Sequence, residues 1–335
     1  MRRWTVTLRA LLRSRSLAWA VAFALCLAST GPASSAWAGG ASVNVFYAGS
    51  LVNLNENLIG PAFAAGSGYS YLGKGAGSGA IANQIKGKLA TPDVVEFADP
   101  AVNTTLMGTA NGSYLSWYLT FATSQLVIGF DPKSRLANEF VQVQKHHLPF
   151  YKALQQKGLK IGRTDPNIDP KGYRAIWMAN LAQKTYHLKG FEAKLFGAAE
   201  NPSQVFPEQV LVARMLTGQV NAGVFYLSEV KDLGIPYITL PAKVNLGSKK
   251  YAKEYATQHF TTAAGQTLTG APIEYTISIP STVKNEAGAE AFVRFVLSPR
   301  VRAISAAHGL LTLKTTLVGD RSVIPAGLTS LIGKK

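Results

Sequence analysis

The sequence predicts an α/β protein with two lobes. A leader-like segment of 38 residues precedes about 297 others, which is more chain than one hydrophobic core usually organises. Apolar, strand-like runs alternate with helix-like runs along the chain. Two early strand-like runs pass through a loop of Gly and Ser directly into a helix-like stretch. Because short strand-to-helix crossovers favour parallel pairing, we expect a mainly parallel sheet flanked by helices in each lobe.

The elements follow from apolar periodicity and from the residues that bound each run. We expect strands at 43–47, 69–72, 94–98, 126–130, 160–162, 222–225, 237–240 and 273–279. We expect helices at 51–63, 81–89, 173–186, 208–216 and 287–297. The helix at 208–216 has helical periodicity and Gly218 as its C-terminal cap, and the last helix ends before Pro299.

Residues 1–38 have the pattern of a secretory signal peptide, with five arginines, an apolar run at 17–28 and Ala36-Trp37-Ala38 as the cleavage site. The apolar run is shorter than the roughly 20 residues that span a bilayer. We therefore expect export and a mature chain that begins at Gly39 in the periplasm or another extracytoplasmic space. The only cysteine, Cys26, is removed with the signal, which excludes disulfides, thiolate metal sites and a cysteine nucleophile.

The formal charge of the chain is +16, and removing the five signal arginines leaves +11. The positive residues are scattered and form no block of the kind that follows a phosphate backbone, so we expect no nucleic-acid partner. A solvated basic surface is the simpler interpretation, and a field that attracts small anions is the alternative.

Two loops point to an anion site. The first strand ends at Ala48, and Gly49-Ser50 leads into a helix; a glycine-rich loop with Ser78 opens a second helix. A helix N-terminus has free N–H groups and a positive partial charge. Two such ends with serine hydroxyls suit a small oxyanion. Asp165 and Tyr226 follow later strands, and the carboxyl ends of parallel strands converge at one edge of a sheet.

These motifs resemble a known family. The loops AGSL at 48–51, GSG at 77–79 and PDV at 92–94 resemble those of the periplasmic molybdate-binding proteins of ABC importers. The segments WYLTFATS at 117–124 and GRTDPNIDPKGYR at 162–174 are more similar to the molybdate/tungstate-binding subfamily. The resemblance extends from about Val43 to Pro280. It implies the two-lobed periplasmic-binding-protein fold (type II), with residues 39–122 plus 272–335 as lobe one, 123–271 as lobe two and the ligand in the cleft between them.

The resemblance also implies roles for individual residues. Gly49 and Ser50 in the first loop, Ser78 in the second loop and the hydroxyl of Tyr226 would donate hydrogen bonds to the oxyanion. Each residue has a structural alternative. Ser50 fits a helix cap, Ser78 fits a flexible glycine-rich turn, and Tyr226 fits a core aromatic at a strand end.

Asp165 has two interpretations. A carboxylate repels a dianion, unless it bonds the metal centre directly, as molybdenum and tungsten allow and sulfur and phosphorus do not. The resemblance implies this direct role, shared with a Glu elsewhere; a turn at Asp165-Pro166-Asn167 is the alternative, and Asp169 fits a turn better. The chain has Phe225 where that Glu is expected, with Glu229 three residues beyond Tyr226. Six-coordinate and tetrahedral binding both stay open.

The resemblance implies capture of molybdate or tungstate and delivery to an inner-membrane ABC permease with its cytoplasmic ATPase, by a monomer without cofactor or free metal cation. Alternatives are another oxyanion, sulfate or phosphate, and an exported hydrolase. We expect no enzyme, because the sequence offers no Ser-His-acid constellation. His146-His147 is a weak metal candidate, because adjacent side chains point apart.

Overall fold

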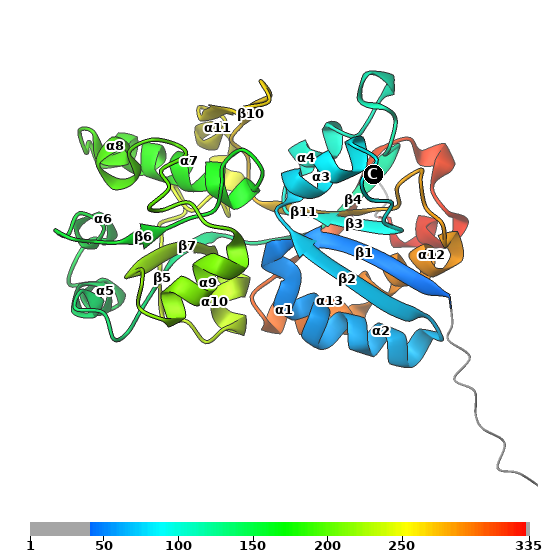
Figure 1. Cartoon of the computed structure of the whole chain (residues 1–335), viewed down its shortest axis with the longest axis horizontal. Coiled ribbons are helices and arrows are strands. Elements are labelled where there is room, and N and C mark those ends of the chain that lie inside the picture. The colour runs from blue at the N-terminus through cyan, green and yellow to red at the C-terminus, as the bar shows by residue number, and fades with distance from the viewer. Residues whose placement is uncertain (1–40, 333–335) are drawn as a thin grey trace, which may run out of the picture. The chain divides into compact units, whose positions relative to one another are not determined.

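The computed structural model describes residues 41–332, which belong to one compact unit of the chain. The predicted signal peptide and its cleavage site lie outside the described residues. Within the described unit, two sheets with flanking helices form two lobes (Figure 1). The prediction of a two-lobed α/β fold is therefore confirmed.

Lobe one is built on a six-stranded sheet in the order β12-β4-β11-β3-β1-β2. Its strands are β1 (Ser42–Ala48), β2 (Ser70–Ala76), β3 (Val94–Phe97), β4 (Trp117–Thr123), β11 (Glu274–Ser278) and β12 (Leu311–Gly319). Strand β1 pairs in parallel with β2 and β3, whereas the other three pairings are antiparallel. The sheet is thus mixed, which corrects the prediction of mainly parallel pairing. Strand β4 leads the chain out of this lobe and β11 returns it, so these two neighbours run in opposite directions.

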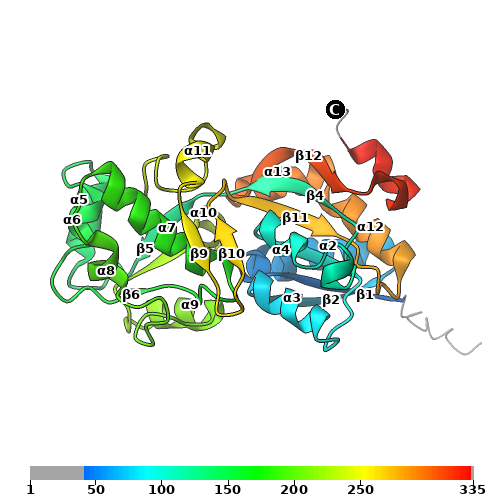
Figure 2. The same ribbon diagram turned by 90° about the horizontal axis from the view of Figure 1, so that it is seen from above.

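Lobe two contains a four-stranded sheet in the order β6-β7-β5-β8. Its strands are β5 (Leu126–Phe130), β6 (Ile161–Gly162), β7 (Ala222–Tyr226) and β8 (Tyr237–Thr239). Only β6 and β7 are parallel. A separate hairpin, β9 (His259–Thr261) with β10 (Thr267–Thr269), follows in the chain, and Figure 2 shows it between the helices of the two lobes. The chain crosses from lobe one between β4 and β5, over Ser124 and Gln125.

Helices flank each sheet. In lobe one they are α1 (Val52–Leu54), α2 (Gly60–Ser67), α3 (Ser78–Lys86), α4 (Pro100–Thr104), α12 (Glu286–Val296) and α13 (Pro299–Ala307). In lobe two they are α5 (Ala137–Gln144), α6 (Phe150–Ala153), α7 (Pro170–Thr185), α8 (Phe191–Phe196), α9 (Glu208–Leu216), α10 (Leu227–Asp232) and α11 (Ala252–Tyr255). The strand alternation of β3 places Val94 in the core under α2 and α12, and Val95 in the core under α3 and α4.

The five predicted helical stretches are all present, four of them with altered limits. Helix α9 has the predicted bounds, whereas the 51–63 stretch is broken by one turn of π-helix at Asn55–Ile59. Helix α7 begins at Pro170 instead of residue 173, because Asp169 caps it by accepting a hydrogen bond from the Lys171 amide. The expected helices do not include α4, α5, α6, α8, α10, α11 and α13. Of these, α4 and α13 also begin at a proline behind a capping residue.

One carboxyl group is buried inside the sheet of lobe one. Glu96 of β3 is 1% exposed, and its Oε2 accepts a hydrogen bond of 2.6 Å from Asn55 Nδ2. Burial raises the pKa of Glu96 to about 7, although the hydrogen bond from Asn55 lowers it. Between about pH 4.5 and pH 7, the folded protein therefore holds a proton that the unfolded chain, with an ordinary pKa of 4.5, has lost.

We predict that the free energy of unfolding falls as the pH rises from about 4.5 to about 7, by about 3 kcal/mol from this group. Glu96→Gln is neutral at every pH and should remove that decrease, so the variant gains stability above pH 7 relative to the wild type. Urea denaturation across this pH range measures the difference. Glu286→Gln, an exposed glutamate of the same lobe, is the matched control and should leave the pH dependence unchanged.

Candidate functional site

Three of the predicted hydroxyls lie where the two lobes meet. Ser50 Oγ lies 2.9 Å from the hydroxyl of Tyr275 on β11. The ring of Tyr275 in turn packs edge-on against the ring of Tyr226, with 6.1 Å between centroids. Ser78, the first residue of α3, accepts a hydrogen bond of 3.1 Å from the Ala98 amide at the end of β3. All three serine and tyrosine side chains are buried.

The guanidinium of Arg174 joins the lobes beside these hydroxyls. From α7 of lobe two, Nη2 forms a 2.8 Å ion pair with Asp99 Oδ2 of lobe one. Nη1 donates to the Ala98 carbonyl at 2.6 Å and to the Tyr226 hydroxyl at 2.7 Å. Tyr173 adds a hydrogen bond of 2.6 Å to the same Asp99 oxygen. Burial lowers the pKa of Arg174, but Tyr226 and Asp99 more than offset this, so the net pKa is raised and the cation is stabilised.

A second buried cation lies three residues earlier on α7. Lys171 Nζ contacts Oε1 of Glu208 and Oε1 of Glu229, each at 2.5 Å. The other oxygen of Glu229 accepts a hydrogen bond of 2.6 Å from the amide of Tyr226, so this carboxylate caps α10. Burial lowers the pKa of Lys171, and the two carboxylates raise it beyond its ordinary value.

Glu208 brings lobe two against the first loop of lobe one. A Cβ atom at Gly49 would lie 1.8 Å from Glu208 Oε2, so a larger residue at this position would have to displace the end of the Glu208 side chain. A cavity of about 140 Å³ lies between the lobes here, lined by Gly49, Ser50, Glu208 and Glu229 among others. Burial raises the pKa of Glu208 well above its ordinary range, Lys171 lowers it, and Glu229 raises it further.

Asp165 lies outside this network. Its Oδ1 accepts a hydrogen bond of 2.8 Å from the Asn167 amide, which is the turn considered as the alternative. Asp169 is the N-cap of α7, as a turn residue should be, and burial with the charge of Glu208 raises its pKa to about 7. The structure thus places Gly49, Ser50, Ser78 and Tyr226 at the lobe boundary and leaves Asp165 three residues beyond the end of β6.

Phe225 occupies the position at which the family resemblance implies a Glu, and its side chain packs in the core of lobe two. The ring is fully buried in lobe two and lies 5.3 Å from Lys171 Nζ. Glu229, the candidate replacement, has both oxygens engaged, one by Lys171 and one by the Tyr226 amide. Neither residue therefore presents a free carboxylate in the structure.

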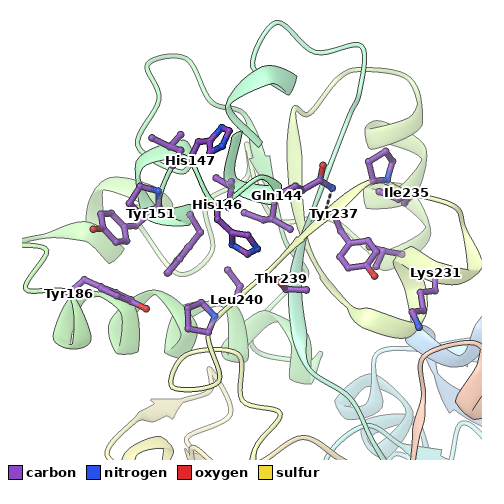
Figure 3. Close-up of a pocket in the computed structure, with 18 of the residues that line it drawn as sticks. Gln144, His146, His147, Tyr151, Tyr186, Lys231, Ile235, Tyr237, Thr239 and Leu240 are labelled. Atoms are coloured by element: carbon purple, nitrogen blue, oxygen red, sulfur yellow. Dashed lines mark hydrogen bonds between the residues drawn. The ribbon is translucent and has the colours of Figure 1, made fainter. Parts of the chain in front are cut away.

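A larger cavity of about 1080 Å³ lies elsewhere in lobe two, beside β8. Figure 3 shows Tyr151, Tyr186, His146 and Tyr237 around it, and Gln144 donating a hydrogen bond to the Tyr237 carbonyl. None of the predicted site residues lines it. Hydroxyl and charged side chains from both lobes meet at the boundary between the lobes, so this boundary is favoured as the candidate site.

The charged groups at the boundary are mostly acidic. Lys171 and Arg174 face the carboxyl groups of Asp99, Asp169, Glu208 and Glu229. An added dianion therefore needs hydroxyl and amide donors and the loss of negative charge from the site. The hydroxyls of Ser50 and Tyr226 are such donors, because each can turn its proton toward an acceptor.

Sequence reasoning missed the charged residues of this site, although their signals were present. Lys171 and Arg174 fall inside the 162–174 motif, and Asp99 precedes Pro100 as a capping residue does. Glu208 was recognised only as the start of a helix. Their mutual contacts join residues that are up to 75 positions apart, which no local pattern indicates.

Two further properties concern the described residues. Among residues 41–332, no helix is long and apolar enough to cross a bilayer. The same part of the chain has no group of three or more His, Cys, Asp or Glu side chains placed to hold a metal ion.

Comparisons with known proteins agree with this architecture. A family model described as bacterial extracellular solute-binding protein matches residues 43–311. An uncharacterized solute-binding protein of Petrotoga mobilis is 33% identical over 274 residues, which cover 79% of this chain and 82% of the relative. A molybdate/tungstate-binding protein of Pyrococcus abyssi is 29% identical over 232 residues, covering 63% of this chain and 66% of the relative.

Among solved structures, the periplasmic molybdate-binding protein of Azotobacter vinelandii aligns with a TM-score of 0.57 at 20% identity. The alignment covers 80% of this chain and 98% of that protein. At this identity the likeness shows the shared two-lobed fold.

We predict that Arg174→Met lowers the free energy of unfolding by about 3–5 kcal/mol, because it leaves the buried Asp99 carboxylate without its cation. Urea denaturation measures this loss. Lys249→Met is the matched control: Lys249 pairs with Glu274 at 3.0 Å but is 68% exposed, so its loss should cost less than about 1 kcal/mol. Equal losses in the two variants would contradict the assigned role of Arg174.

Proposed function

Because this chain belongs to the bacterial extracellular solute-binding proteins, we propose that it captures molybdate or tungstate and delivers it to an ABC permease. The observation that carries the proposal is the convergence of Ser50, Ser78 and Tyr226 at the lobe boundary, from three separate strand ends. The Pyrococcus abyssi relative supports the choice of ligand, because it is named a molybdate/tungstate-binding protein and is 29% identical in sequence to this chain.

In this proposal the oxyanion lies between the lobes. Gly49 and Ser50 approach it from the first loop, and Ser78 from the start of α3, where helix amides add positive partial charge. Tyr226 approaches from lobe two, with Arg174 holding its hydroxyl in place. Asp165 as a direct ligand of molybdenum or tungsten stays a prediction, and it requires the carboxylate to leave its turn with Asn167.

Transport follows from the two-lobed architecture. In the proposal, the connections at Ser124-Gln125 and before Glu274, which join the two lobes, would serve as the hinge over which the lobes open and close around the ligand. The closed form, which joins surfaces of both lobes, is the form that an inner-membrane permease with a cytoplasmic ATPase would recognise. The protein would act as a monomer and would turn over no substrate.

Hydroxyl and amide donors suit any tetrahedral oxyanion, so sulfate or phosphate is the alternative ligand. Cavity size separates these ions, because metal–oxygen bonds are longer than those of sulfate. An exported hydrolase is disfavoured because the Ser50 hydroxyl pairs with the hydroxyl of Tyr275 and not with a histidine.

We predict that the exported protein begins at Gly39, because the signal peptide is cleaved after Ala38. N-terminal sequencing of the protein recovered from the periplasm of an expression host tests both export and the cleavage position. Retention of Met1 in the cytoplasm would contradict the proposed location.

We predict that molybdate or tungstate stabilises the protein by about 4 kcal/mol at about 1,000 times its dissociation constant. Thermal unfolding with molybdate, tungstate, sulfate and phosphate in parallel reveals which oxyanion is bound.

Tyr226→Phe should weaken binding by about 10- to 100-fold, since it removes one hydrogen bond to a charged ligand. Tyr237→Phe, a tyrosine on β8 outside the site, should bind as the wild type does. A stronger shift with sulfate, or none with any oxyanion, would reject the proposed ligand.

A further inference from the structure

The positive charge of the described chain is concentrated in lobe two. Residues 123–271 contain 18 lysines and arginines against 10 acidic residues, whereas the described part of lobe one contains nine against eight. Helices α5, α6 and α8 lie at the end of lobe two that points away from lobe one (Figures 1 and 2). Seven exposed lysines belong to this end, on these helices or on the segments next to them: Lys145, Lys152, Lys157, Lys160, Lys184, Lys189 and Lys194. We refer to their surface as the basic end.

Contacts between the segments bring these lysines onto one surface. Arg135, before α5, donates a hydrogen bond of 3.1 Å to the carbonyl of Lys157. Lys194 of α8 borders a surface pocket together with residues of the 154–159 turn. Its Nζ also donates to the carbonyl of Lys189 at 3.3 Å. The segments that follow α6 and α7 are therefore neighbours of α5 and α8.

A pair of tyrosines joins α6 to the end of α7. The rings of Tyr151 and Tyr186 lie 5.0 Å apart between centroids, so the adjacent Lys152 and the nearby Lys184 belong to the same end. Both tyrosines are half-buried and border the larger cavity of lobe two (Figure 3). Tyrosine rings, with an apolar body and a polar hydroxyl, are enriched where proteins meet the membrane–water interface.

Acidic side chains do not balance the charge of the basic end. Between residues 140 and 191, all of which are described, the only acids are Asp165 and Asp169, and neither is exposed. Glu139 and Glu192, on either side of this range, are half-buried. The ion pairs of the described residues include none of the seven lysines. A surface that serves only solubility normally mixes both signs, whereas a one-sided field attracts surfaces of opposite charge.

The basic end does not serve the oxyanion site through its field. Lys171 and Arg174, the cations of the lobe boundary, lie near the start of α7, and Lys184 lies in its last turn. At 1.5 Å per residue, Lys184 is about 20 Å along the helix from Lys171. Exposed charges are screened over about 8 Å at physiological ionic strength. The partner of the basic end therefore approaches from outside the protein.

We propose that the basic end binds the surface of an anionic phospholipid membrane. Each lysine near such a surface adds to the attraction, and several lysines together give reversible attachment. A flexible ammonium is a point charge that suits a diffuse layer of headgroups. The forked guanidinium that typically contacts nucleic-acid phosphates is not offered here, because Arg135 is engaged by the Lys157 carbonyl. The inference goes beyond the proposed function and does not depend on a bound oxyanion.

Co-sedimentation with lipid vesicles tests the inference. The experiment uses residues 39–335, because the arginines of residues 1–38 would themselves bind anionic lipid. The protein should bind vesicles of phosphatidylcholine with about 30% phosphatidylglycerol about tenfold more strongly than vesicles of phosphatidylcholine alone. Binding should disappear at about 0.5 M salt, where screening shortens the range of the attraction to a few ångströms.

Two triple variants locate the contact. Vesicle binding should weaken about tenfold when three charges of the basic end are removed by Lys152→Gln, Lys157→Gln and Lys194→Gln. The matched control removes three exposed lysines of lobe one and should bind vesicles as the wild type does, with Lys86→Gln, Lys88→Gln and Lys284→Gln. Because all six side chains are exposed, both variants should unfold at the temperature of the wild type.

Three results would overturn the inference. The first is equal binding to the two kinds of vesicle, the second is equal weakening in the two triple variants, and the third is binding to single-stranded DNA but not to vesicles at the same salt. The basic-end variant should bind molybdate as the wild type does. Loss of oxyanion binding in the wild type would reject the proposed function and leave the membrane inference standing, so the two fail separately.

Discussion

The buried guanidinium of Arg174 is the contact on which the arrangement of the two lobes depends. Removing a charge from water costs several kcal/mol, and good geometry with complementary partners is needed to offset that cost. Arg174 meets this condition only because Asp99 and the Ala98 carbonyl come from lobe one while the Tyr226 hydroxyl comes from lobe two. The same contact thus fixes the hydroxyl of the candidate site and links it to the contact between the lobes.

The charge balance at the lobe boundary constrains how an anion can enter. Two buried cations face four carboxyl groups, of which Asp169 has a pKa near 7 and Glu208 a raised pKa. Adding a dianion to such a site without rearrangement is unfavourable at the low effective dielectric of the boundary.

Much of the fold could be predicted because its signals are local. The periodicity of α9, the strand before Gly49 and the hydroxyls of Ser50 and Tyr226 are properties of short segments, and the structure contains these elements. Strands β4 and β12 were missed because they are stabilised by pairing with each other across almost 200 residues of chain. The mixed pairing of both sheets was missed for the same reason, since strand direction depends on where the chain crosses between lobes.

The sequence by itself determined the two-lobed α/β class, the helix starts at the two glycine–serine loops and the family resemblance, because each depends on neighbouring residues. Only the tertiary structure decided which side chains meet. It placed Asp165 in a turn, and it assembled Lys171, Arg174 and Glu208 with the predicted hydroxyls. The physical reason is that ion pairing and burial act between groups that are close in space, and residues far apart in sequence acquire that proximity only when both lobes are folded and in contact.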